Sequence, residues 1–164
     1  MTEAPSSSSS PSVSGIGRRI GICVARWHRE IVDELHAGAV DVLIASGVSA
    51  SDIVVVECPG SYELPVAALH LIENAGVDAV LAFGVVVRGE TAHFEYVSSP
   101  VAHGLMDISV STGVPCLFGV LTTETIEQAR ERCGGIHGHK GREAAQGALQ
   151  LLHSLSALTT DDKS

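Results

Sequence analysis

The chain has 164 residues and a mass of 17.0 kDa, a size that allows one ordinary domain with one continuous core and excludes a second full domain. Ten basic residues against nineteen acidic residues give a formal net charge of −9, which would repel a phosphate backbone and argues against nucleic-acid binding. The apolar run from Ala79 to Val87 is far shorter than the roughly 18 residues that a membrane-spanning helix needs. We therefore expect a soluble protein with no nucleic-acid or membrane partner.

Both ends of the chain differ in composition from the rest. Residues 1–17 are mainly Ser with two Pro residues, and they lack the basic start and apolar centre of a secretory signal. Because such a segment buries too little apolar surface to offset its ordering entropy, we predict disordered tails at 1–17 and 159–164 and a folded domain at 18–158. The cysteines are dispersed and form no C-x-x-C pair, which predicts reduced thiols in a cytoplasmic protein; they are Cys23, Cys58, Cys116 and Cys133.

Continuous apolar runs alternate along the chain with segments of helical period. The runs predict buried strands at Ile20–Ala25, Ile53–Cys58, Ala79–Val87 and Pro115–Leu121. The periodic segments predict helices at Arg29–Ser46, Glu63–Ala75, around Val97–Ile108, Glu124–Cys133 and Gly141–Leu158, with a Gly-rich connection between the last two. Strands without polar alternation are typical of parallel sheets covered on both faces. This order predicts a three-layer α/β/α sandwich around a four-stranded parallel sheet, flavodoxin-like in type.

Ligands of open parallel sheets bind at the carboxyl ends of the strands, which selects four segments: 26–28, 59–63, 88–91 and 121–123. The usual nucleotide signatures are missing, since no G-x-G-x-x-G follows the first strand and no G-x-x-x-x-G-K-[ST] occurs. Instead, the start of the helix after the third strand offers free N–H groups and the Thr91 hydroxyl, which suit a phosphate. A plain helix cap explains Thr91 equally well.

Several side chains at this edge suit a ligand, and each also has an ordinary structural explanation. His93 is a candidate general acid/base, and Trp27 could stack on a planar heterocycle. Tyr62 and Glu63 follow the second strand, where a carboxylate could accept hydrogen bonds from a polyhydroxy chain. Core packing, or a favourable charge at a helix N-terminus, explains these residues as well.

The C-terminal third supplies cations. Arg132 and Lys140 flank the Gly-rich connection, and a guanidinium could hold a phosphate through two parallel hydrogen bonds; a solvated helix charge is the alternative. His137 and His139 form an H-x-H pair without a nearby carboxylate or Cys ligand, so no metal site is predicted there.

Several long motifs occur together in one order: 59-PGSYELP-65, 84-GVVVRGETAHFEYV-97, 118-FGVLTTETIEQA-129, Glu131-Arg132, and 139-HKG-141 before 143-EAA-145. From about Ile20 to Leu155 the chain resembles the 6,7-dimethyl-8-ribityllumazine synthases of riboflavin biosynthesis. The resemblance implies a transferase that condenses 5-amino-6-ribitylaminouracil with 3,4-dihydroxy-2-butanone 4-phosphate to give the lumazine, phosphate and water. It implies no metal or redox cofactor.

The resemblance also assigns roles to residues. Trp27 would stack on the pyrimidine, and His93 would transfer protons. The other implied substrate-binding residues are Ser61, Tyr62 and Glu63 for the uracil amine and its ribityl chain, Val85, Val86 and Val87 along the ring, Glu90, Thr91 and Arg132 at the phosphate, and Phe118 and Lys140. Trp27-His28 and Tyr62 depart from the commoner Phe-Asn and Phe of the family.

In the family the site lies between subunits of a homopentamer, and Phe118, Arg132 and Lys140 match the positions that the adjacent chain donates. Some members assemble twelve pentamers into an icosahedral shell, for which enclosed riboflavin synthase is a candidate partner. Pentamer-only members of the family often carry an insertion after this arginine. The step from Arg132 to Lys140 is eight positions and has no insertion, so the resemblance favours the shell. The alternative function is a catalytically silent shell protein that binds a lumazine or flavin, although binding by stacking alone would need neither His93 nor Arg132.

Overall fold

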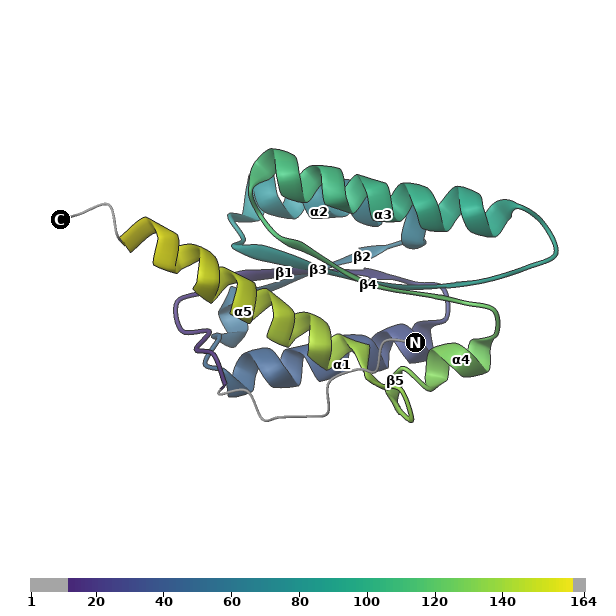
Figure 1. Cartoon of the computed structure of the whole chain (residues 1–164), viewed down its shortest axis with the longest axis horizontal. Helices are drawn as coiled ribbons and strands as arrows, with labels where there is room; N and C mark the ends of the chain where they lie inside the picture. The colour runs from purple at the N-terminus through teal and green to yellow at the C-terminus, as the bar shows by residue number, and fades with distance from the viewer. Residues whose placement is uncertain (1–11, 161–164) are drawn as a thin grey trace.

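The computed structural model describes residues 12–160 (Figure 1). Its strands are β1 (Ile20–Ala25), β2 (Ile53–Cys58), β3 (Ala79–Val87), β4 (Cys116–Thr123), β5 (Cys133–Gly135) and β6 (Gly138–His139). Its α-helices are α1 (Arg29–Ala45), α2 (Leu64–Ala75), α3 (His93–Thr112), α4 (Ile126–Arg130) and α5 (Lys140–Thr160). Two 3₁₀ turns, Ala50–Asp52 and Ser61–Glu63, precede β2 and α2.

The main sheet is parallel throughout, with strand order β2-β1-β3-β4. The chain order therefore reverses between β1 and β3, and this reversal places a crevice at the carboxyl ends of those two strands. Eight of the nine residues of β3 are buried, as expected for a strand with neighbours on both sides and helices on both faces. The predicted parallel α/β/α architecture is confirmed.

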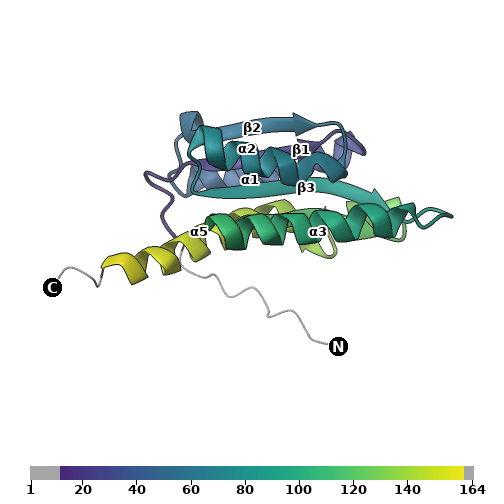
Figure 2. The same ribbon diagram turned by 90° about the horizontal axis from the view of Figure 1, so that it is seen from above.

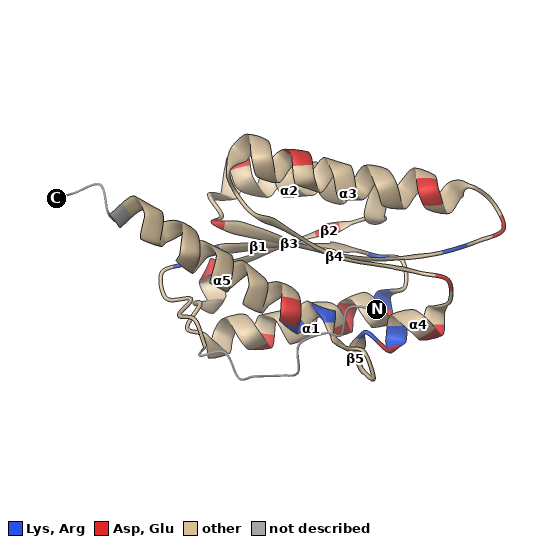
Figure 3. Ribbon diagram, viewed as in Figure 1, with Lys and Arg blue, Asp and Glu red and all other residues tan. Residues whose placement is uncertain are grey.

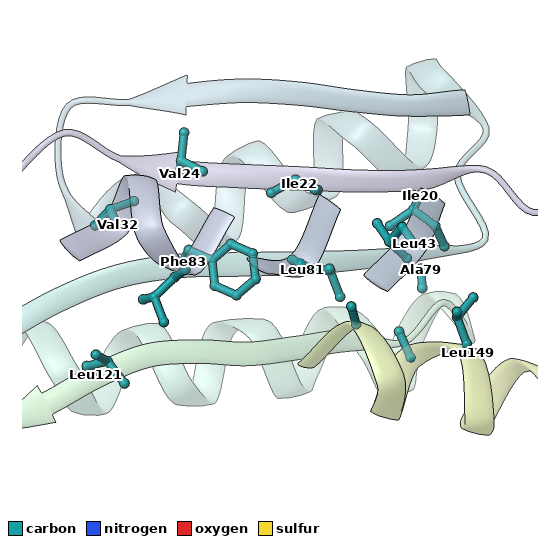
Figure 4. Packing of buried hydrophobic residues seen from close by; sticks show 14 of the residues in the cluster. Ile20, Ile22, Val24, Val32, Leu43, Ala79, Leu81, Phe83, Leu121 and Leu149 are labelled. Atoms are coloured by element: carbon teal, nitrogen blue, oxygen red, sulfur yellow. The ribbon is translucent and has the colours of Figure 1, made fainter. Parts of the chain in front are cut away.

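Helices cover the two faces of the sheet in two layers. α2 and α3 lie on one face, and α1, α4 and α5 lie on the other (Figures 1 and 2). The face under α1 and α5 buries Ile22, Leu81 and Phe83 among its core residues (Figure 4). A Cβ at position 119 would lie 2.4 Å from the Phe83 ring, so Gly119 of β4 makes room for the largest fully buried side chain.

Two predicted elements near the C-terminus needed correction. The fourth strand continues two residues past Leu121, to Thr123. The helix predicted over Glu124–Cys133 is only Ile126–Arg130, because Thr125 caps its start by accepting a hydrogen bond from the Gln128 N–H at 3.2 Å. The predicted Gly-rich connection contains a short antiparallel hairpin, in which Cys133 pairs with His139.

The predicted N-terminal tail falls mostly outside the described residues. Within its described part, Val13 packs against the core, and the Gly15 N–H donates to the Ser46 carbonyl at 2.7 Å. At the other end, α5 continues to Thr160, and residues 161–164 of the predicted C-terminal tail also lie outside the described residues. The domain bounds 18–158 remain a prediction.

The α2 and α3 layer carries few charges (Figure 3). On α3, Glu95 and Asp107 are the charged residues, whereas Tyr96, Met106 and Val110 are large apolar side chains left mostly exposed. Such an exposed apolar stripe on one helix is characteristic of a surface that meets another protein chain.

Candidate functional site

A cavity of about 760 Å³ lies at the carboxyl ends of β1, β2 and β3, where the strand order predicts a binding site. Its wall combines the segments after β1 and β2, the end of β3 and the first turn of α3. We call it the strand-end cavity. It is lined by Trp27, His28, Pro59, Gly60, Ser61, Tyr62, Glu63, Val85, Val86, Val87, His93, Tyr96 and Val97.

Trp27 presents its indole on one side of the strand-end cavity and is 70% exposed. A Cβ at Gly60 would lie 3.2 Å from Cδ1 of the indole, so the glycine lets the backbone after β2 approach the ring closely. The Arg26 N–H donates to the Cys58 carbonyl at 3.0 Å, which holds the ends of β1 and β2 together. An exposed aromatic face at this position can stack on a planar ring.

His28 lines the same cavity and was not predicted as a site residue. It has φ 55° and ψ 48° and is the one non-glycine residue of positive φ among residues 12–160. Its carbonyl accepts hydrogen bonds from the N–H groups of Ile31 and Val32, so this backbone conformation begins α1. A signal for it was available, because His, like Asn and Asp, is enriched in the left-handed region.

Ser61 and Glu63 occupy the 3₁₀ turn under the cavity. The Glu63 Oε2 accepts a hydrogen bond from the Gly60 N–H at 2.9 Å, so part of this carboxylate stabilises the turn and its other oxygen remains for a ligand. The Ser61 hydroxyl is buried, with the residue 6% exposed, and has no hydrogen-bond partner within the described chain. A buried hydroxyl of this kind is costly unless a ligand or water satisfies it.

The valines at the end of β3 form the floor of the strand-end cavity. Val86 belongs to the core under α2 and α3, whereas Val85 belongs to the core under α1 and α5. Their side chains therefore lie on opposite faces of the sheet. The Val87 side chain lies on the same face as that of Val85. A ring lying across this strand end would meet the Val86 side chain together with the backbone of the strand.

The segment from Gly89 to His93 leads from β3 into α3. Glu90 and Thr91 are exposed and do not line the strand-end cavity, whereas His93 does, as the first residue of α3. The Thr91 Oγ1 accepts a long hydrogen bond, 3.4 Å, from the His93 N–H. A helix N-terminus of this kind offers backbone N–H groups that can bind an anion.

Phe118, Arg132 and Lys140 lie elsewhere on the chain. They line a second cavity of about 390 Å³ along the free edge of β4, beside the start of α5. We call it the edge cavity, and it shares no lining residue with the strand-end cavity. Within one chain, the predicted site residues thus separate into two groups, and the group in the edge cavity is the one that the resemblance assigns to an adjacent chain.

The two cations of the edge cavity differ in their surroundings. Lys140 Nζ lies 2.7 Å from Glu143 Oε2, so its charge is largely matched. Arg132 donates to the Gln128 carbonyl at 2.7 Å, and no carboxylate of the described residues lies within 4.0 Å of it. The Arg132 guanidinium keeps donors available for an anion.

Cys58 borders the strand-end cavity at the end of β2. Burial raises the pKa of its thiol above the ordinary value, and the nearby Glu63 carboxylate raises that pKa further. The thiol therefore stays protonated at neutral pH and is a poor nucleophile. Among the lining residues, His28, Glu63 and His93 carry the imidazole and carboxylate groups that could transfer a proton.

Two further features are absent from residues 12–160. No group of three or more His, Cys, Asp or Glu residues in this part of the chain is arranged to hold a metal ion. No helix in the same range combines the length and apolar character needed to cross a membrane.

A flavodoxin-like parallel sheet with an aromatic and imidazole-lined cavity at its switch point defines an α/β protein with a small-molecule site at its strand ends. Residues 17–156 match the family model described as 6,7-dimethyl-8-ribityllumazine synthase. The chain belongs to this family, whose characterised activity is that of a transferase in riboflavin biosynthesis.

Curated relatives cover most of the chain. A 6,7-dimethyl-8-ribityllumazine synthase of Porphyromonas gingivalis is 51% identical over 133 residues, which are 81% of this chain and 83% of the relative. The enzymes of the same name from Aquifex aeolicus and Desulfotalea psychrophila are 44% and 47% identical over 142 residues, each alignment covering 87% of this chain and 92% of the relative. The resemblance found in the sequence motifs is confirmed.

Proposed function

We propose that this chain condenses 5-amino-6-ribitylaminouracil with 3,4-dihydroxy-2-butanone 4-phosphate to give 6,7-dimethyl-8-ribityllumazine, phosphate and water. The observation that carries the proposal is the strand-end cavity, which is lined by Trp27, Glu63 and His93 in a chain that belongs to the lumazine synthase family. A stacking surface, an acceptor for a polyhydroxy chain and a proton-transfer group are what the reaction needs.

The chemistry assigns each group a task. The uracil amine attacks the ketone and loses water to form an imine, the phosphate leaves, and the ribityl-bearing nitrogen closes the ring with loss of a second water. Trp27 holds the pyrimidine plane, and the unpartnered Ser61 hydroxyl with the free Glu63 oxygen binds the polar substrate. His93 moves protons during imine formation and elimination.

Most of the rate acceleration then comes from placement. Holding two reactants in register can supply up to about 7–11 kcal/mol of the barrier, whereas one general acid/base contributes about 10²- to 10⁴-fold. This chemistry requires no redox step, and the proposal invokes no cofactor. A chain of this kind needs a rigid cleft, which the ends of three strands and one helix provide.

We also propose that the complete site forms between two copies of the chain, in a homopentamer that assembles further into a shell. The strand-end cavity of one copy would meet the edge cavity of its neighbour, so that Arg132, with its available donors, reaches the substrate phosphate beside Thr91 and Glu90. The exposed apolar side chains of α3 support self-association, and the short hairpin between Arg132 and Lys140 supports the shell. Riboflavin synthase is the proposed enclosed partner.

The direct test is to mix purified protein with both substrates and follow the absorbance and fluorescence of the lumazine. Product formation above the uncatalysed rate supports the proposal. A protein that binds lumazine or riboflavin but forms no product would support the alternative, a silent ligand-binding shell.

Complementation tests whether the site lies between chains. His93→Ala impairs the strand-end cavity, and Arg132→Ala impairs the edge cavity. When the two variants are refolded together, about a quarter of the interfaces of a ring should pair two intact halves and regain wild-type activity. A mixture no more active than its parts, although sedimentation shows mixed oligomers, would place the whole site within one chain. Sedimentation and light scattering of the wild type also distinguish pentamer from shell.

We further propose a cytoplasmic location. All four cysteines are free thiols, as expected in a reducing compartment.

A further inference from the structure

Arg88 is the first residue after β3 and contacts three other segments. Its N–H donates to the Thr123 carbonyl at 2.9 Å, which extends the β3–β4 pairing by one bond. Its guanidinium donates to Glu124 at 3.0 Å, just after β4, and forms an ion pair with Glu95 in the first turn of α3. The same group lies 4.3 Å from the centre of the Phe94 ring, a favourable cation–π distance.

Little else fixes the segment between Arg88 and α3. Residues 89–92 are exposed, and a Cβ at Gly89 would meet no atom within 4 Å. Ala92 precedes α3 and has no side chain that could cap it. The polar contacts of this segment are the long 3.4 Å bond from the His93 N–H to Thr91 Oγ1 and the 3.3 Å bond from the Tyr96 N–H to the Ala92 carbonyl. The half-buried Phe94 ring, on which Arg88 lies, is the apolar anchor.

The two carboxylates that bind Arg88 also limit its ability to bind an anionic substrate. With Glu95 and Glu124 both bound, the guanidinium is matched by two negative charges and is a poor attractor for a substrate phosphate. Hydrogen bonding from Arg88 lowers the pKa of Glu95, so this carboxylate stays ionised at neutral pH. A planar guanidinium can hold two carboxylates and lie on a ring at once, whereas a lysine ammonium cannot reproduce that geometry.

We propose that Arg88 is a positioning residue: by joining the end of β4 to the first turn of α3, it fixes the His93 imidazole and the 89–92 segment for the reaction. The role in catalysis rests on the proposed function. Exposed ion pairs contribute little to global stability, so the effect should be local. A misplacement of about 1 Å can cost on the order of a hundredfold in rate.

The test compares Arg88→Met with Arg88→Lys and with Arg142→Met as the matched control. Arg142 forms a comparable exposed ion pair with Asp41 at 3.1 Å and lines neither cavity. Arg88→Met should lower kcat by about tenfold or more and speed hydrogen–deuterium exchange at residues 92–97, with the unfolding midpoint nearly unchanged. Arg88→Lys should recover only part of kcat, and Arg142→Met should match the wild type.

Three results would overturn the proposal. The first is an Arg88→Met protein whose kcat stays within twofold of the wild type. The second is a rise in KM for the phosphate substrate alone, with kcat and exchange unchanged, which would make Arg88 a phosphate ligand. The third is unchanged exchange at residues 92–97, a readout that holds even if the wild type forms no lumazine and the proposed function itself fails.

Discussion

The Lys140 N–H donates a 2.8 Å hydrogen bond to the Arg132 carbonyl, so the two cations of the edge cavity begin and end one closed loop. The β5–β6 hairpin forms this loop. Cys133, which follows Arg132 in the sequence, pairs with His139, which precedes Lys140. The backbone positions of Arg132 and Lys140 are therefore fixed relative to each other, although their side chains carry the charges. Holding the two backbones in place reduces the conformational entropy that is lost when the cavity binds an anion.

Arg132→Ala should mainly weaken use of the phosphate substrate. Charge-assisted hydrogen bonds contribute about 1.5–3 kcal/mol, so KM for the butanone phosphate should rise roughly 10- to 100-fold while kcat at saturation changes less. Steady-state kinetics with each substrate varied in turn measures this. An equal rise in KM for the uracil amine would contradict the assignment.

Lys140→Ala provides a graded comparison in the same cavity. Because Glu143 already matches the Lys140 charge at 2.7 Å, its removal should raise the same KM less than removal of Arg132. A larger effect from Lys140 would mean that substrate binding separates it from Glu143.

His93→Ala should slow turnover without abolishing it. Placement of the two substrates survives in this variant, so kcat should fall by about 10²-fold or more, within the range of one general acid/base. His153→Ala, on the exposed face of α5, serves as the control. Complete loss of activity, in a folded variant that still binds lumazine, would assign His93 more than proton transfer.

The bounds of β1, β2 and β3 were predicted correctly from the sequence because each is an apolar run, interrupted in β2 by Glu57 alone, with polar or turn-forming residues at its ends. The bounds of the elements after β4 were not predicted correctly. Residues 124–133 have helical character, but the Thr125–Gln128 cap starts the helix late, and Gly134 and Gly138, with φ of 106° and 78°, turn the chain into a hairpin. The pairing between Cys133 and His139 depends on tertiary contacts, which the local sequence pattern does not determine.

The candidate site was likewise predicted only in part from the sequence. Trp27, Glu63 and His93 could be placed together from the strand-end rule alone, because parallel strands deliver their carboxyl ends to one edge. His28, Tyr96 and Val97 were not predicted as lining residues: the segment 26–28 was placed at the ligand edge without a role for His28, and Val97 matches the buried face of a helix. The edge cavity depends on how α5 crosses β4, which only the folded chain determines.

The stability of the chain should decrease in mild acid because of His36. This residue lies half-buried in α1, and its Nε2 is buried without a partner among the described residues. Burial lowers the pKa of its imidazole below the ordinary 6.5, against the opposing effect of Asp33. Between the folded pKa and 6.5 the unfolded chain binds more protons than the folded chain, so the unfolding free energy falls as the pH drops below 6.5.

Denaturant unfolding at about pH 8 and about pH 5.5 measures this effect in the wild type and in His36→Leu at one protein concentration. The variant should lose less stability between the two pH values than the wild type. His70→Leu, at an exposed position of α2, serves as the control for replacing an imidazole. An unaltered dependence in His36→Leu would assign the acid sensitivity to other groups.

Two glycines of α5 should respond in opposite directions to the same substitution. A Cβ at Gly141 would lie 2.0 Å from the Leu35 carbonyl oxygen and 2.7 Å from its carbonyl carbon, both backbone atoms of α1. Gly141→Ala must therefore push the start of α5 away from α1, at a cost of about 1–3 kcal/mol or more. The shift would also carry Lys140, one residue away, out of the edge cavity.

Gly147, two turns further along the same helix, has open space: its nearest neighbour is the Leu117 side chain at 3.8 Å. Gly147→Ala should raise stability by up to about 1 kcal/mol through helix propensity. Unfolding midpoints at fixed chain concentration, with KM for the phosphate substrate, compare the pair. If Gly141→Ala were as stable as the wild type with its KM unchanged, the close contact between α1 and α5 would not be what places Lys140, and the edge cavity would have to be held by the β5–β6 hairpin alone.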